Sequence, residues 1–245
     1  VYYISLNQKN ANLAKPEVRQ AFKYLIDYDA LSTTILKGIG EIHQSFLPKG
    51  DLGAINDNPF KLDVAKAKEL LAKAGHADGF EMEAAFPGMN VYGVDLSLLM
   101  QKVQQDLSKI NVKLDLQPVP FANWRERVNG DGIPMTAVFY APDYYGTSQY
   151  IEYFGMTKGS PWARRAGAER EPSVLNPKES ELYKSALAAS GDEAAKLWHQ
   201  AGEEMIKDRV ILPLISPNLI LAYKSNVQGV RYSACCNLPL AEISH

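Results

Sequence analysis

The chain has 245 residues, of which 46% are hydrophobic and 22% are charged, a composition typical of a globular protein with one large core or two modest ones. Its formal net charge of −2 argues against the basic surface that nucleic-acid binding requires, and its sequence contains no apolar run long enough to span a membrane. Its two cysteines, Cys235 and Cys236, are too few for a disulfide scaffold, and as neighbours they are expected to be two semi-buried thiols.

The first seven residues have the pattern of a strand. They lack the methionine, the charged start and the apolar core that mark a secretory leader. We therefore expect the chain to be a piece of a longer protein.

Two helices are predicted between residues 15 and 40. Pro16 suits the first turn of a helix, where a missing N–H has no consequence, and apolar residues follow it at helical spacing. Asp29 is expected to cap the second helix and Gly38 to end it.

Two further helices have clear start signals. Asp63 is expected to cap a helix that stops at Gly75, and Asp95 to cap a helix with apolar residues at spacings of three and four as far as Ile110. Strands are predicted over residues 80–86 and 112–117, and a loop over 87–90.

The second half of the chain continues the alternation of helices and strands. Helices are predicted over residues 123–128, 178–189 and 192–208, and strands over 135–140, 211–215 and 219–223. Residues 141–176 are predicted to be irregular, and a loop of this length is usually functional or disordered. The alternation predicts an α/β fold with a mixed sheet flanked by helices.

Patterns that would indicate catalysis are missing. The four histidines show no metal-ligand spacing with another histidine or a cysteine, and the sequence has no nucleophile elbow and no phosphate-binding glycine loop. We therefore expect neither an enzyme nor a cofactor or metal site.

A recognition site is the other reading of the polar residues. The run from Phe139 to Tyr145 leaves a predicted strand and surrounds Asp143 with aromatic side chains. Strand ends are common ligand positions in α/β sheets, and a carboxylate among aromatic rings suits a cationic amine. A solvated turn explains the same residues equally well. Trp162 and Arg164, in the irregular region, are weaker candidates.

Several motifs resemble one family of transport receptors. Residues 15–22 read Lys-Pro-Glu-Val-Arg-Gln-Ala-Phe, residues 25–30 read Leu-Ile-Asp-Tyr-Asp-Ala, and residues 63–75 end in Leu-Leu-Ala-Lys-Ala-Gly. Together with the order of the later elements, they resemble the dipeptide/oligopeptide/nickel solute-binding proteins of ABC importers, solute-binding protein family 5. The resemblance covers nearly the whole chain.

This resemblance implies a two-lobed receptor that closes on its ligand like a clamp. Residues 1–208 would form the second, C-terminal lobe with a periplasmic-binding-protein-like fold, and residues 209–245 a return segment toward the hinge. The first lobe is expected to be absent from this chain. The implied location is periplasmic or otherwise extracytoplasmic, and the implied partners are a peptide or small-molecule ligand and the membrane subunits of a permease.

The resemblance also assigns ligand-binding residues. Asp143 matches the aspartate that pairs with a peptide's amino terminus, Tyr140 falls where a tryptophan often stands, and Tyr144 lies in the same aromatic segment. Tyr92 matches the tyrosine of dipeptide binders, whereas Asn90 replaces their arginine. A longer peptide or an uncharged polar solute therefore remains a possible ligand, as does a sugar, an opine or a metal chelate. The alternative from another functional class is a periplasmic hydrolase.

Overall fold

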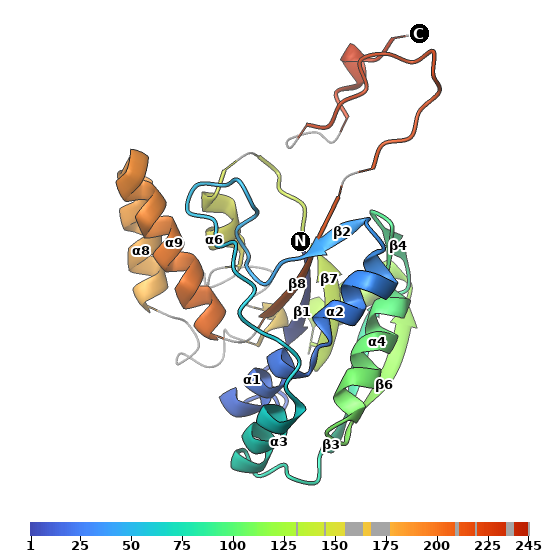
Figure 1. The fold of residues 1–245 in the computed structure, drawn as a ribbon, viewed down its shortest axis with the longest axis vertical. Coiled ribbons are helices and arrows are strands. Elements are labelled where there is room, and N and C mark those ends of the chain that lie inside the picture. Colours follow the sequence, from blue (N-terminus) through green and yellow to red (C-terminus); the bar gives the residue numbers. More distant parts are fainter. Residues whose placement is uncertain are drawn as a thin grey trace.

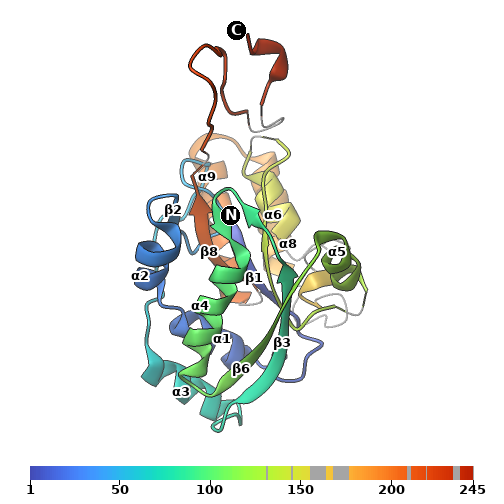
Figure 2. The ribbon, with the colours of Figure 1, turned by 90° about the vertical axis from the view of Figure 1, so that its right-hand side faces the viewer.

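The computed structural model describes residues 1–130, 132–144, 146–154, 164–167, 177–208, 211–218, 220–233 and 238–244. Within these residues, six strands form one sheet in the order β2-β8-β1-β7-β3-β6. Helices cover both faces of the sheet, and the residues after β8 extend away from the body (Figures 1 and 2).

The sheet combines antiparallel and parallel pairs, which confirms the predicted mixed α/β fold. Its strands are β1 (Tyr2–Leu6), β2 (Gly40–Ile42), β3 (Phe80–Pro87), β6 (Val112–Val119), β7 (Met135–Phe139) and β8 (Ile211–Pro217). Strand β1 is antiparallel to both β7 and β8, so Tyr2 lies between Phe139 and Ile215. Strands β3 and β6 are parallel. Two short strands, β4 (Asn90–Val91) and β5 (Val94–Asp95), form a separate hairpin.

One face of the sheet is covered by the helices of the first half of the chain. These are α1 (Pro16–Leu25), α2 (Tyr28–Ala30) with the π-helix η1 (Leu31–Leu36), α3 (Val64–Lys73) and α4 (Leu96–Ser108). Alternate strand residues such as Ile4, Phe86 and Ala137 join the apolar stripes of these helices in the larger core. Burial of this core is the main force that holds the helices on the sheet.

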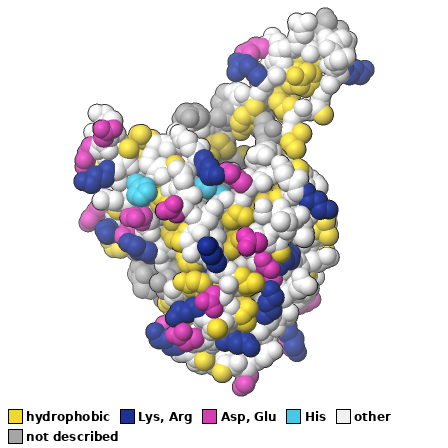
Figure 3. All heavy atoms as spheres, in the orientation of Figure 1, with side chains coloured by type: hydrophobic (Ala, Val, Ile, Leu, Met, Phe, Trp, Pro, Cys, Tyr) yellow, Lys and Arg dark blue, Asp and Glu magenta, His cyan; other side chains and the backbone are white. Residues whose placement is uncertain are grey.

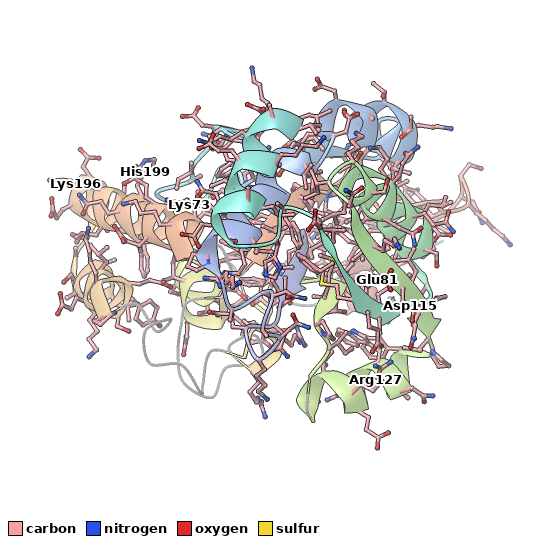
Figure 4. All side chains as sticks on the ribbon, turned by 90° about the horizontal axis from the view of Figure 1, so that it is seen from below. Lys73, Glu81, Asp115, Arg127, Lys196 and His199 are labelled. Carbon is pink, nitrogen blue, oxygen red and sulfur yellow. The ribbon has the colours of Figure 1, made fainter. Side chains whose placement is uncertain are left out.

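The opposite face carries α5 (Phe121–Asn129), α6 (Ser148–Phe154), α8 (Pro177–Ala188) and α9 (Gly191–Asp208). A second core lies under them, in which Tyr3, Trp124 and Trp198 are buried. Figure 4 shows Arg127 on α5, across from the strands that carry Glu81 and Asp115. Arg127 pairs with the Glu83 carboxylate of β3, which ties α5 to the sheet.

The helix starts confirm two of the three predicted caps. The Asp63 carboxylate accepts a hydrogen bond from the Lys66 backbone N–H at 2.8 Å, and Asp95 accepts from Ser97 at 2.7 Å. The prediction for Asp29 is wrong, because Asp27 accepts from the Ala30 backbone N–H at 3.0 Å and begins the helix two residues earlier.

Three other predictions differ from the structure. The predicted loop over 87–90 is wrong in part, since β3 includes Pro87 and β4 begins at Asn90. A strand over 219–223 is wrong for the described residues, since residues 220–223 are irregular and β8 makes the pairs with β1 and β2. Helix α6 lies in the region predicted to be irregular, because a short helix carries few turns of periodic signal.

The segment beyond β8 bonds mainly to itself within its described residues. Gln228 forms an isolated bridge with Ser244, and Arg231 pairs with Glu242 at 2.6 Å. Strand β8, which precedes this segment, belongs to the main sheet. Cys235 and Cys236 lie outside the described residues.

On the face in Figure 3, acidic and basic side chains are interspersed. Among the described residues, none of the helices is long and apolar enough to cross a membrane.

Candidate functional site

A pocket of about 300 Å³ opens at the edge of the sheet where β7 and β8 end. Because β7 and β8 are both antiparallel to β1, which lies between them, their carboxyl ends meet at this edge. Strand ends of this kind are common ligand positions in α/β sheets. The charged and tyrosine side chains among its described lining residues are Lys49, Asp51, Tyr92, Tyr140, Tyr144, Tyr150 and Tyr232.

The tyrosines reach the pocket from separate parts of the chain. Tyr140 directly follows β7, Tyr150 lies on α6, and their rings meet edge to face at 5.5 Å between centroids. Tyr92 lies in the turn between β4 and β5 with a φ of 46°, a conformation uncommon outside glycine. Tyr232 comes from the segment beyond β8. Their flat rings form a wall suited to packing against a solute.

Gln149 fixes the loop that follows β7. Its side-chain oxygen accepts from the Tyr140 hydroxyl at 2.9 Å and from the Asp143 backbone N–H at 2.8 Å, and its amide nitrogen donates to the Tyr144 carbonyl. The side chain is buried. One amide therefore holds three points of the loop in a set shape.

Burial dominates the electrostatics of the pocket. It raises the pKa of the Tyr140 and Tyr150 hydroxyls well above the usual range, and the charges of Asp143 and Asp51, respectively, add to the shift. Burial also raises the pKa of the Asp51 carboxyl. Tyr140 and Tyr150 are thus neutral hydrogen-bonding groups across the physiological range.

The structure brings together three of the predicted ligand residues. Tyr92, Tyr140 and Tyr144 line the same pocket. Asp143 lies close enough to Tyr140 to shift its pKa, but its side chain is exposed and is not among the residues that line the pocket.

The remaining candidates lie elsewhere or are not described. The Asn90 side-chain oxygen accepts from the Gly93 backbone N–H at 3.1 Å, which stabilises the β4–β5 turn and leaves Asn90 exposed. Arg164 is exposed and is not among the lining residues. Trp162 lies outside the described residues. The roles assigned to all of these residues remain predictions.

Sequence reasoning missed five residues in or beside the pocket: Lys49, Asp51, Gln149, Tyr150 and Tyr232. Asp51 follows Pro48, Lys49 and Gly50, which is a turn signal but no indication of a pocket. Gln149 and Tyr150 lie on the unpredicted helix α6. Tyr232 reaches the pocket only through the path of the chain after β8.

No group in the described part of the chain has the composition of a metal centre. These residues include no cluster of three histidine, cysteine, aspartate or glutamate side chains that could hold an ion.

The comparisons with known proteins identify the family. The model of the bacterial extracellular solute-binding proteins, family 5 middle region, matches residues 1–162. The chain belongs to this family. The resemblance noted in the sequence motifs is therefore confirmed.

Several relatives of this family 5 chain are known. It is 25% identical over 237 residues to the glutathione-binding protein GsiB of Salmonella typhimurium, which covers 93% of the chain and 44% of that protein. HbpA2 from Haemophilus parasuis has a TM-score of 0.83 at 21% identity, over 100% of this chain and 48% of that one. DppA from Helicobacter pylori, in complex with the peptide STSA, has a TM-score of 0.80 at 20% identity, over 99% of this chain and 46% of that one.

These likenesses confirm the lobe fold of the family 5 proteins. The chain spans about half the length of the relatives it matches. The family description and the name of GsiB refer to binding rather than to a reaction.

Proposed function

We propose that the chain is the second lobe of an extracytoplasmic receptor that binds a peptide-class solute and delivers it to an ABC permease. Residues 1–208 supply the ligand-binding lobe, and residues 209–245 return toward a first lobe that this chain does not include. The solute is bound and released unchanged, without catalysis and without a cofactor. Family membership supports this proposal, as do the names of relatives that bind glutathione and peptides.

The tyrosine-lined pocket beside Asp143 is the observation that carries the proposal. A peptide offers a charged amine and a chain of amide groups, and tyrosine hydroxyls can donate to or accept from those amides. The Asp143 carboxylate, exposed in this lobe, is free of protein partners among the described residues. Closure of a first lobe over the pocket removes water from the pair of amine and carboxylate and strengthens it.

Asp143→Asn in the full-length receptor tests this assignment, because the change keeps the shape of the side chain and removes its charge. If Asp143 pairs with the ligand amine in a closed cleft, we expect a loss of about 2–5 kcal/mol, or roughly 30- to 4,000-fold in affinity. Calorimetric titration with a pool of short peptides, and with the same pool N-acetylated, measures the effect.

The control is Asp57→Asn, which removes the charge of an exposed carboxylate that is not among the pocket residues. It should leave affinity unchanged. Equal binding of the free and acetylated pools by the unmodified receptor would show that Asp143 does not recognise an amine. A sugar ligand would reduce the effect of Asp143→Asn to about 0.5–1.5 kcal/mol, since an amide still hydrogen-bonds a hydroxyl.

A further inference from the structure

Asp51 places a second carboxylate at the pocket. It lies in the loop after β2 and is half-buried among the lining residues. Within the described part of the chain, its carboxylate has no hydrogen-bond or ion-pair partner. A half-buried charge without a partner is costly unless a ligand supplies the opposite charge.

The loop that carries Asp51 is held firmly on two sides. The Thr147 hydroxyl donates to the Leu52 carbonyl at 2.9 Å, which joins the loop to the start of α6. Gly53, at a φ of 81°, lies so close to α9 that an added Cβ would be 2.5 Å from the Cβ of Trp198. This support fixes the position of Asp51 before a ligand arrives, which favours binding because little ordering remains to be done.

The charge balance of the pocket leaves Asp51 uncompensated. Lys49 is the cationic side chain among the described lining residues. Its ammonium is engaged by the Glu41 carboxylate at 2.6 Å. The remaining side-chain charge at the pocket is therefore negative.

The two carboxylates lie next to different members of one aromatic pair. The charge of Asp143 raises the pKa of the Tyr140 hydroxyl, whereas the charge of Asp51 raises the pKa of the Tyr150 hydroxyl. The two tyrosine rings contact each other. A solute that packs against these rings would meet one carboxylate beside each ring. A single amino terminus could neutralise only one of them.

We propose that the solute carries a second cationic group, such as a lysine or arginine side chain of a short peptide, and that Asp51 recognises it. This inference rests on the proposed function and makes the pocket selective for basic peptides. Asp51 acts as a specificity residue, since the amino terminus is left to Asp143.

Defined tripeptides test the inference in the full-length receptor. Calorimetry compares Ala-Ala-Ala, Ala-Lys-Ala, Ala-Ala-Lys and Ala-Glu-Ala. We expect at least one lysyl peptide to bind about tenfold more tightly than Ala-Ala-Ala, and Ala-Glu-Ala to bind more weakly. Asp51→Asn should abolish the lysyl preference, so that in this variant the lysyl peptides bind no more tightly than Ala-Ala-Ala.

Two further variants control for other effects of the substitution. Asp51→Glu keeps the charge and should keep the preference for a lysyl peptide, which a merely structural role for Asp51 does not predict. Asp57→Asn removes an exposed charge farther along the same loop and should behave as the unmodified receptor does.

Failure of the inference can be told apart from failure of the proposed function. If Ala-Ala-Ala binds but neither lysyl peptide binds more tightly, or if Asp51→Asn retains the preference, basic selectivity through Asp51 is wrong and peptide binding stands. If none of the four peptides binds, the proposed peptide function is wrong, and with it the inference.

Discussion

Gln149 shows how one buried side chain can govern the shape of a binding surface. Its three hydrogen bonds all go to the loop of Tyr140, Asp143 and Tyr144, which holds the candidate amine site. All three partners precede α6, so these hydrogen bonds are not part of the regular hydrogen bonding of a helix or strand. The loop therefore depends on this amide for its conformation.

Replacement of Gln149 by methionine should loosen the loop. The variant keeps a side chain of similar length but leaves the Tyr140 hydroxyl and the Asp143 N–H without their acceptor, at a cost of about 1–3 kcal/mol. Amide hydrogen exchange at Asp143 should accelerate. Gln149→Glu retains the one oxygen that accepts both hydrogen bonds and should retain protection at Asp143, while losing the donation to Tyr144.

The matched control lies on the exposed side of the same helix. Among the described residues, the Glu152 carboxylate accepts a hydrogen bond from the half-buried Tyr183 hydroxyl, at 3.1 Å, so Glu152→Gln should not alter exchange at Asp143. Unchanged protection in Gln149→Met would mean that the loop holds its shape without Gln149.

Among the elements, the start of α2 has two nearby aspartates with different roles. Asp27 caps the helix through its side chain, whereas Asp29 is exposed within the first turn. Asp27→Ala should lower the free energy of unfolding by about 0.5–2 kcal/mol through the lost cap. Asp29→Ala should change it by less than about 0.5 kcal/mol. Urea denaturation of both variants measures the difference. Equal losses in the free energy of unfolding would show that Asp27 is not the cap.

Elements with a strong local signal were predictable, and elements defined by distant partners were not. Helix α4 has its cap and apolar spacing within one stretch of sequence, so its start at Leu96 follows from Asp95. Strand β2 has three residues and exists because it pairs with β8, far along the chain. The expected strand over 219–223 failed for the same reason, since β-structure requires a neighbour that local sequence does not specify.

The candidate site follows this division. The aromatic run after β7 was visible in sequence, and two of its tyrosines line the pocket. Asp51 and Tyr232 were not predictable as lining residues, because they come from the loop after β2 and from the segment after β8. Motifs thus located part of the pocket, and the path of the chain supplied the rest.

For the whole molecule, buried His43 is expected to make the free energy of unfolding depend on pH. The imidazole is 1% exposed, and its Nε2 lies 2.8 Å from the Leu47 carbonyl, to which the neutral ring donates. Burial lowers the pKa of His43 below its usual 6.5 in the folded state. Below pH 6.5 the unfolded chain binds a proton that the folded chain does not, so stability falls until the lowered pKa is reached.

We expect the loss to approach at most about 1.4 kcal/mol per pH unit in that window. Urea midpoints of the unmodified chain and of His43→Gln, measured from pH 7.5 to 5, isolate the contribution, which should disappear in the variant. His199→Gln, on the exposed surface of α9 (Figure 4), is the control. A parallel decline in His43→Gln and the unmodified chain would assign the pH dependence to other groups.

The position of β1 in the sheet has a consequence for the order of folding. Its neighbours are β7 on one side and β8 on the other, and β2 joins the sheet only through β8. During synthesis, the first strand therefore has an open edge until residues 211–217 emerge. Such non-local pairing slows folding, and an open edge invites wrong partners. Truncation before β8 should thus produce aggregation rather than a smaller lobe, because β8 fills the place in the sheet between β1 and β2.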